Sequence, residues 1–206
     1  MSLARLLQLA SPALPVGAYS YSGGLEAAVE AGVVKDAASA ERWIGDVLEH
    51  AVASFDAPLL LQSISFEDRV EELNDLYLAS RETAELRAET VQMGYSLCRL
   101  LGEFGVQGLP EGEVAFPTAF ACAARAWGID PRDAVQAYLW SWLENQVMAA
   151  LKAVPLGQTD GQKMLLALGA RLEKRSGAAE IGSNFAPGLA ILSSRHETQY
   201  SRLFRS

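Results

Sequence analysis

Apolar residues recur along this chain at helical spacing, and this pattern constrains the fold more than any other feature of the sequence. Alanine, leucine, glutamate and arginine fill long windows with a repeat of about 3.6 residues, which is typical of amphipathic helices. No segment alternates polar residues with β-branched or aromatic residues, as a half-buried strand does. The sequence therefore predicts an all-α fold.

The length and composition of the chain fit one packed domain. It has 206 residues, of which 50% are hydrophobic and 20% charged, so it can bury a large core. No internal repeat or low-complexity run divides it. We therefore predict a single-domain bundle of several helices spanning residues 1–206.

Charge and cysteine content exclude several kinds of partner. The formal net charge of -8 repels phosphate backbones and anionic lipid head groups, so we expect neither nucleic acid nor a membrane as partner. No apolar stretch approaches the roughly 20 residues of a transmembrane helix. Cys98 and Cys122 lie far apart and outside any CxxC spacing, which fits a reducing cytoplasm and predicts a cytoplasmic protein.

Proline and glycine mark the expected breaks between helices. Residues 11–24 hold two prolines and three glycines and should form an irregular N-terminal segment, and Pro58 should kink or split the helix that contains it. A second link rich in glycine, serine and proline is expected over residues 176–188. Between the breaks we expect helices over about 3–8, 25–31, 36–63, 65–81, 82–103, 130–153 and 159–174, with a last one from about residue 189.

Side chains that can cap a helix mark several of the expected starts. Asp36 or Ser39 can cap one helix, and Asp130 precedes a proline in the favoured first helical position of another. Two further pairs fit the capping-box pattern, namely Ser65 with Asp68 and Thr159 with Gln162.

Helical projection assigns faces to two of these helices. In the helix over residues 82–103 the predicted buried face holds Ala84, Ala88, Val91, Tyr95 and Cys98, and the predicted solvated face includes Glu82, Glu85 and Glu89. The helix over residues 130–153 is apolar nearly all round except for one polar seam. Its members are Ser141, Glu144, Asn145 and Lys152, which either satisfy one another in the core or serve a partner.

The residues needed for familiar catalytic or metal sites are not arranged in any known pattern. His50 and His196 are the two histidines, no serine lies in a GxSxG motif, and HETQY over residues 196–200 lacks the second histidine of HExxH. GQTDGQKM over residues 157–164 lacks the lysine and spacing of a phosphate loop. We predict a non-catalytic protein with no catalytic residues, no metal site and no tightly bound cofactor.

Four separated blocks of sequence resemble one known family. They are SPALPVGAYSYSGGLE over residues 11–26, RETAELRAE over 81–89, AYLWSWLENQVMAALKAVPLGQTDGQ over 137–162 and RHETQYSRLFRS over 195–206. These blocks resemble the urease accessory UreF family. The resemblance implies an all-helical homodimer that helps to insert nickel into urease.

The resemblance also implies partners and contact sites. The implied partners are the scaffold protein UreD, also called UreH, the GTPase UreG, whose nucleotide cycle this family regulates, and apo-urease; nickel and GTP belong to those partners. Matching motif to motif places partner contacts at Tyr19, Ser20, Tyr21 and Glu26, at Arg81, Glu82 and Glu85, and at Arg195, His196, Glu197, Gln199, Tyr200, Arg202, Leu203, Phe204 and Arg205.

The basic, aromatic segment over residues 195–206 (the tail) is expected to be flexible and to be ordered by a partner. Arginine with aromatic residues dominates binding hot spots, and chain ends are poorly ordered unless something holds them. The alternative is that Leu203 and Phe204 dock on this chain's own helices. Two other functions stay open from sequence alone, a small-molecule hydrolase and a helical adaptor unrelated to urease.

Overall fold

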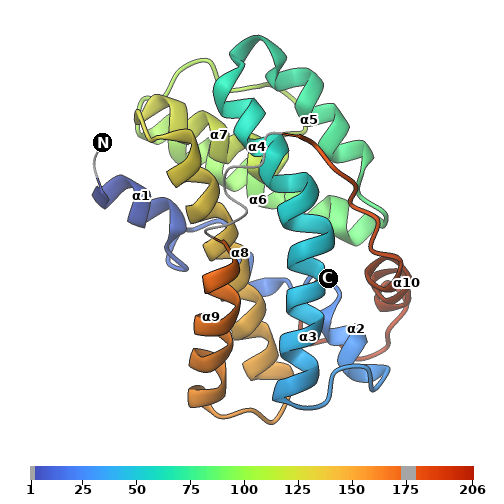
Figure 1. Cartoon of the computed structure of the whole chain (residues 1–206). Helices are drawn as coiled ribbons and strands as arrows, with labels where there is room; N and C mark the ends of the chain where they lie inside the picture. The colour runs from blue at the N-terminus through green and yellow to red at the C-terminus, as the bar shows by residue number, and fades with distance from the viewer. Residues whose placement is uncertain (1–2, 173–179) are drawn as a thin grey trace.

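The prediction of an all-α fold is confirmed by a computed structural model, which describes residues 3–172 and 180–206 (Figure 1). No strand occurs in that part of the chain. The helices are α1 (Leu3–Ala10), α2 (Leu25–Glu30), α3 (Ala37–Val47), α4 (Ala57–Ser65), α5 (Val70–Ala79), α6 (Ala84–Glu103), α7 (Phe116–Ala126), α8 (Pro131–Ala153), α9 (Gln158–Leu172) and α10 (Pro187–His196). A π-helix, η2 (Leu48–Asp56), joins α3 to α4, and 3₁₀ turns form η1 (Ala18–Ser20) and η3 (Glu67–Arg69).

Helix α8 runs through the middle of the bundle and contacts α1, α2, α3, α4, α7 and α9. Its nearly continuous apolar surface suits this position, because a helix that is hydrophobic all round has to be buried. It begins where the sequence predicts, since the Asp130 carboxylate accepts a hydrogen bond of 2.9 Å from the backbone N–H of Arg132. The rings of Phe116, Phe120 and Tyr138 pack together where α7 meets it, with centroids 5.6 to 6.0 Å apart.

Helix α6 lies so close to the segment just before α7 that one position requires glycine. A Cβ atom on Gly94 would lie 1.9 Å from the carbonyl oxygen of Val114. The predicted buried face of α6 is wrong for Ala84, Ala88 and Tyr95, which are exposed. The face that packs inward is Leu86, Thr90, Met93, Gly94, Leu97 and Leu101.

Pro58 splits a long helix without ending it, and α3, η2 and α4 follow one another as a single rod (Figure 1). Proline has no N–H to donate to the carbonyl four residues earlier, which belongs to Ser54. That carbonyl accepts instead from the N–H of Gly182 at 2.9 Å, and the Ser54 hydroxyl donates to the carbonyl of Ser183 at 2.6 Å. The segment before α10 is thereby anchored beside the π-helix.

Both predicted capping boxes, Ser65 with Asp68 and Thr159 with Gln162, are wrong. The Ser65 hydroxyl donates back to the carbonyl of Leu61 inside α4, and α5 begins later, at Val70, with no side-chain cap. Thr159 lies inside α9. At the start of that helix the N–H of Gly157 donates a hydrogen bond to the Asp160 carboxylate. Part of the predicted link over residues 176–188 lies outside the described residues. Asp36 does cap α3, through a reciprocal bond pair with Ser39.

Candidate functional site

The irregular N-terminal segment and the tail lie side by side. The N–H of Arg205 donates to the carbonyl of Ser20 at 2.8 Å, and the N–H of Ser22 donates to the carbonyl of Ser206 at 2.9 Å. The Ser22 hydroxyl makes a second bond to that carbonyl. Both Ser22 and Ser206 are buried. Two segments at opposite ends of the sequence thus form one continuous structure.

Glu26 on α2 holds the tail by its backbone. Its two carboxylate oxygens accept from the consecutive N–H groups of Leu203 at 2.7 Å and Phe204 at 2.9 Å. Because Glu26 is itself buried, its charge needs such donors to replace water. The Phe204 ring turns inward and is buried, whereas the Leu203 side chain is exposed.

His196 lies between two carboxylates and is completely buried. Its Nδ1 is 2.6 Å from Glu85 on α6, and its Nε2 is 3.2 Å from Glu26 on α2. The second oxygen of Glu85 pairs with the guanidinium of Arg202 in the tail. We call Glu26, Glu85, His196 and Arg202 the histidine hub; it ties α2, α6, α10 and the tail together.

These contacts dock the tail over residues 195–206 on the chain's own helices, while its expected flexibility and its ordering by a partner stay predictions. Phe204 and Ser206 are buried within the chain, and Glu197 accepts from the N–H of Ala84 at the start of α6. The alternative that the tail docks on the chain's own helices is right for Phe204 and wrong for Leu203. The physical reason is that buried carboxylates on α2 and α6 supply acceptors that the tail's amides and arginine can satisfy.

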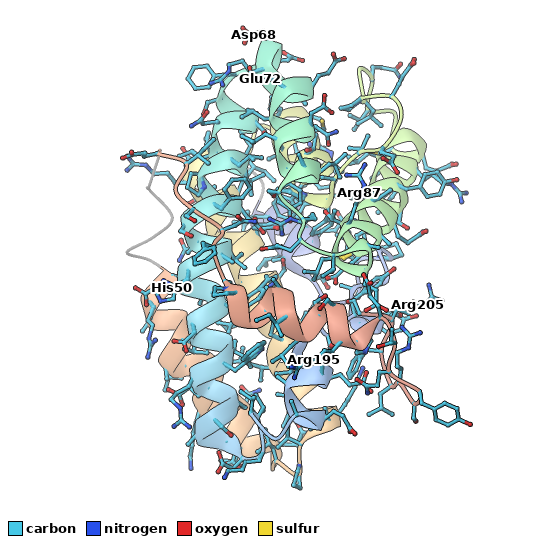
Figure 2. All side chains as sticks on the ribbon, turned by 90° about the vertical axis from the view of Figure 1, so that its right-hand side faces the viewer. His50, Asp68, Glu72, Arg87, Arg195 and Arg205 are labelled. Carbon is cyan, nitrogen blue, oxygen red and sulfur yellow. The ribbon has the colours of Figure 1, made fainter. Side chains whose placement is uncertain are left out.

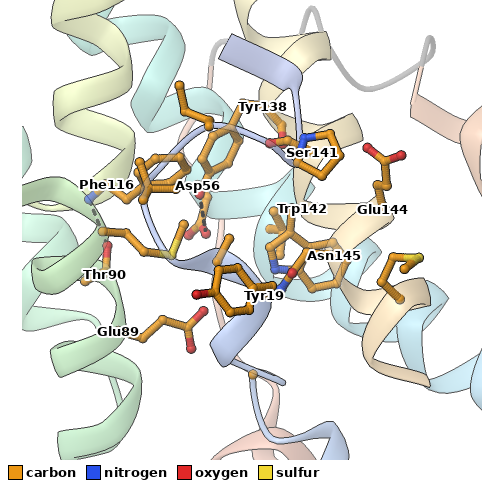
Figure 3. A pocket seen from close by; sticks show the side chains of 18 of the residues that line it. Tyr19, Asp56, Glu89, Thr90, Phe116, Tyr138, Ser141, Trp142, Glu144 and Asn145 are labelled. Atoms are coloured by element: carbon orange, nitrogen blue, oxygen red, sulfur yellow. Dashed lines mark hydrogen bonds between the residues drawn. The ribbon is translucent and has the colours of Figure 1, made fainter. Parts of the chain in front are cut away.

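A cavity of about 200 Å³ opens beside the docked tail. Figure 3 shows Asp56 and Glu89 pointing into it from different helices, with Tyr19 between Glu89 and the α8 residues. Asp56, at the end of the π-helix, accepts from Tyr77 at 3.1 Å and pairs with Arg81 at 3.2 Å. The wall of the cavity therefore combines carboxylates and aromatic rings.

Burial shifts the protonation of the cavity's carboxyl groups. It raises the pKa of Glu89 to about 7, against the opposing effects of the Ser206 hydroxyl and the Arg81 charge. Burial likewise raises the pKa of Asp56, and Arg81 opposes that shift most strongly. It also raises the pKa of Glu144 on the opposite wall. Glu89 and Asp56 thus lie near the guanidinium of Arg81, but the effect of burial outweighs its charge at both.

The polar seam of α8 faces both ends of the chain. Asn145 donates to the carbonyl of Tyr21 at 3.2 Å, and the Lys152 ammonium lies 3.5 Å from the carbonyl of Tyr19. The same ammonium lies over the rings of Tyr19 and Phe204, at 5.9 and 5.6 Å. All four seam residues, Glu144 among them, also line the cavity. The seam therefore joins the N-terminal segment to the tail.

The structure gathers most of the predicted contact residues in one region but divides them between inside and outside. Tyr21, Glu26, His196 and Phe204 are internal. Arg81 lies apart on the wall of the cavity, and Glu82 lies near Asn184. Figure 2 shows Arg195 and Arg205 at the surface around α10. The exposed members are Tyr19, Glu82, Arg195, Glu197, Tyr200, Arg202, Leu203 and Arg205, while Ser20, Glu85 and Gln199 are half-buried.

Sequence reasoning missed several residues that shape this site. Asp56 gave no signal, because a lone aspartate inside an expected helix is indistinguishable in sequence from one that faces solvent. Glu89 did have one, since it lies four residues after Glu85 in the same matched block, but both were assigned to a solvated face. Ser22 and the Thr83–Ser193 hydroxyl pair, 2.8 Å apart, become visible only through contacts distant in sequence.

No group of three or more histidine, cysteine, aspartate or glutamate side chains in residues 3–172 and 180–206 is placed to hold a metal ion. Within the same ranges, none of the helices combines the length and the apolar character needed to cross a membrane.

The fold and the site define an all-helical protein whose two end segments form one surface beside an acidic cavity. Comparison with known proteins narrows this class. The UreF family model matches residues 34–169. Proteins named urease accessory protein UreF are 57% identical in Azoarcus sp. and 54% in Dechloromonas aromatica, each over 100% of this chain and over 96% and 98% of the relative. The chain belongs to the UreF family.

Proposed function

We propose that this chain is a non-catalytic accessory factor in the maturation of urease. Full-length similarity to proteins named urease accessory protein UreF supports this role. In the proposed role it is cytoplasmic, binds the scaffold protein UreD/UreH as a homodimer, and regulates the GTPase UreG during nickel insertion into apo-urease. Nickel and nucleotide are carried by the partners.

The observation that carries the proposal is the outer face of the docked tail. Tyr200 is fully exposed, Leu203 is 72% exposed, and Tyr19 is 69% exposed on the adjoining segment. Arg202 and Arg205 are exposed beside them. Exposed aromatic and apolar side chains flanked by arginine have the composition of binding hot spots. We propose this face, rather than the buried residues, as the contact with the scaffold protein.

A surface substitution tests this better than removal of the tail, because removal would also delete the buried His196, Phe204 and Ser206. Leu203→Asp adds a charge to the proposed face. Leu166→Asp is the matched control, since Leu166 is 80% exposed on α9. We expect Leu203→Asp to lose the scaffold protein in a pull-down and to lower urease activation in cells, with an unchanged circular dichroism spectrum.

The control variant Leu166→Asp should still bind the scaffold protein and still support urease activation. Scaffold binding by Leu203→Asp at the level of the unchanged chain would refute this assignment of the face. Turnover of a small molecule by the purified chain alone would instead favour the hydrolase.

A further inference from the structure

The histidine hub has an unusual proton requirement. A neutral imidazole donates from one ring nitrogen and accepts at the other. Both ring nitrogens of His196 face carboxylate oxygens, which accept hydrogen bonds and cannot donate them when ionised. A neutral ring would therefore direct a lone pair at one carboxylate. Only the imidazolium donates to both.

The charges of the hub balance when His196 is protonated. Glu26 and Glu85 carry two negative charges, and His196 and Arg202 then carry two positive charges. Balance matters because His196 is fully buried and the Glu26 and Glu85 side chains are only 9% and 14% exposed. An unpaired charge in such a place is far more costly than a paired one. The loss of one proton would leave the hub with a net negative charge.

Other charged groups lie on the elements that pack around His196. Glu26 comes from α2 and Glu85 from α6, where Glu89 follows one turn later and bonds to the Ser206 hydroxyl. The tail contributes Arg202, and the neighbours on α10 and just after it are Arg195 and Glu197, both exposed. Glu26 and Glu85 are the ones with contacts to the ring among the described residues.

We propose that His196 is a positioning residue whose proton docks the tail. The imidazolium fixes Glu26, and Glu26 in turn accepts the N–H groups of Leu203 and Phe204. For presentation of the binding face the inference rests on the proposed function; the role of His196 in docking the tail does not.

The sequence itself provides a clean probe of this proton. His50, the other histidine, is exposed on the π-helix, so His50→Gln leaves His196 as the sole imidazole. Long-range ¹H–¹⁵N correlation spectra of the labelled full chain distinguish an imidazolium from a neutral tautomer. We expect both ring nitrogens of His196 to carry protons. A neutral ring together with protected amides at Leu203 and Phe204 would overturn the proposal.

Amide hydrogen exchange tests the consequence for the tail. We expect the Leu203 and Phe204 amides to be protected from exchange in the full chain. His196→Gln, which cannot become a cation, should lower that protection. Glu26→Gln should lower it about tenfold, the effect of losing one charge-assisted hydrogen bond. Glu30→Gln, on an exposed position of the same helix, should change nothing. Protection that is absent in the full chain, or that is unchanged in His196→Gln and Glu26→Gln, would also overturn the proposal.

The scaffold pull-down separates this inference from the proposed function. Exchange and ring protonation are measured on the isolated chain, so they stand or fall without any partner. If both ring nitrogens carry protons and the two amides are protected while the scaffold protein does not bind, the proposed function is wrong and the docking role of His196 is kept. If the scaffold protein binds and the ring is neutral, the proposed function is kept and the docking role of the His196 proton is wrong.

Discussion

Gly94 offers the sharpest test of how the bundle is packed. In Gly94→Ala the new Cβ would lie 1.9 Å from the Val114 carbonyl oxygen and 2.9 Å from the carbonyl carbons of Val114 and Ala115. Close carbon–oxygen contacts in proteins are about 3.3 Å or longer, so α6 would have to move by more than 1 Å. The obstacle is backbone, which cannot rotate away as a side chain can.

The expected magnitude follows from two opposing effects. Overpacking a tight core, backbone shifts included, costs about 1–3 kcal/mol, while replacing glycine by alanine inside a helix returns up to about 1 kcal/mol. Because the contact is very short, we take the upper end of the cost and expect a net loss of about 2 kcal/mol in the free energy of unfolding. For a chain of this length that lowers Tm by about 4–8 °C.

Gly102→Ala is the matched control on the same helix. No atom lies within 4 Å of its added Cβ, so only the gain in helix propensity remains. We expect Tm to rise by about 2–4 °C, and differential scanning calorimetry on both variants measures the contrast. Similar shifts for the two variants, or an unchanged Tm for Gly94→Ala, would refute the close approach of α6 to α7.

Two further predictions concern the cavity. Glu89→Gln should stabilise the chain by about 2–3 kcal/mol at pH 8 and by little at pH 4.5. The folded-state pKa of Glu89 is raised to about 7, so its carboxylate destabilises the folded chain increasingly as pH rises from about 4.5 to 8. A urea midpoint equal to that of the unchanged chain at both pH values would contradict this prediction. Arg81→Met leaves the buried Asp56 unpaired and should cost about 3 kcal/mol, more at pH 8 than at pH 5 because burial already favours the protonated acid. Arg87→Met, which loses the exposed pair with Glu113 and one hydrogen bond to the Leu78 carbonyl, should cost only about 1 kcal/mol in the same urea titration and serves as its control.

The local features of the fold could be predicted from sequence because they depend on neighbouring residues. Asp36 and Asp130 cap helices through amides two or three positions away, so the caps are visible in a short window. The effect of Pro58 on its helix is equally local. What could not be predicted is where the freed carbonyl of Ser54 finds its donor, because Gly182 is distant in the sequence.

The buried face of α6 shows why helical projection failed there. Projection favours apolar side chains, but Gly94 is buried because two backbones meet, and Thr90 is buried because its hydroxyl accepts from the N–H of Phe116 at 3.0 Å. Glu85 is half-buried for the same kind of reason, since His196 and Arg202 replace its water. A polar residue with distant partners is indistinguishable in sequence from one that faces solvent.

The meeting of the two end segments has a consequence for the order of folding. The bonded pair Glu26 and His196 is separated by 170 positions, and Ser22 and Ser206 by 184, whereas α6 packs on α7 and α8 on α9 across short connections. Contacts between distant residues pay the closure entropy of the whole intervening chain, so they form late. During synthesis the N-terminal segment has to wait until residues 196–206 have been made. We therefore expect the exposed face built on this junction to form only after residues 196–206 have been made, late in folding.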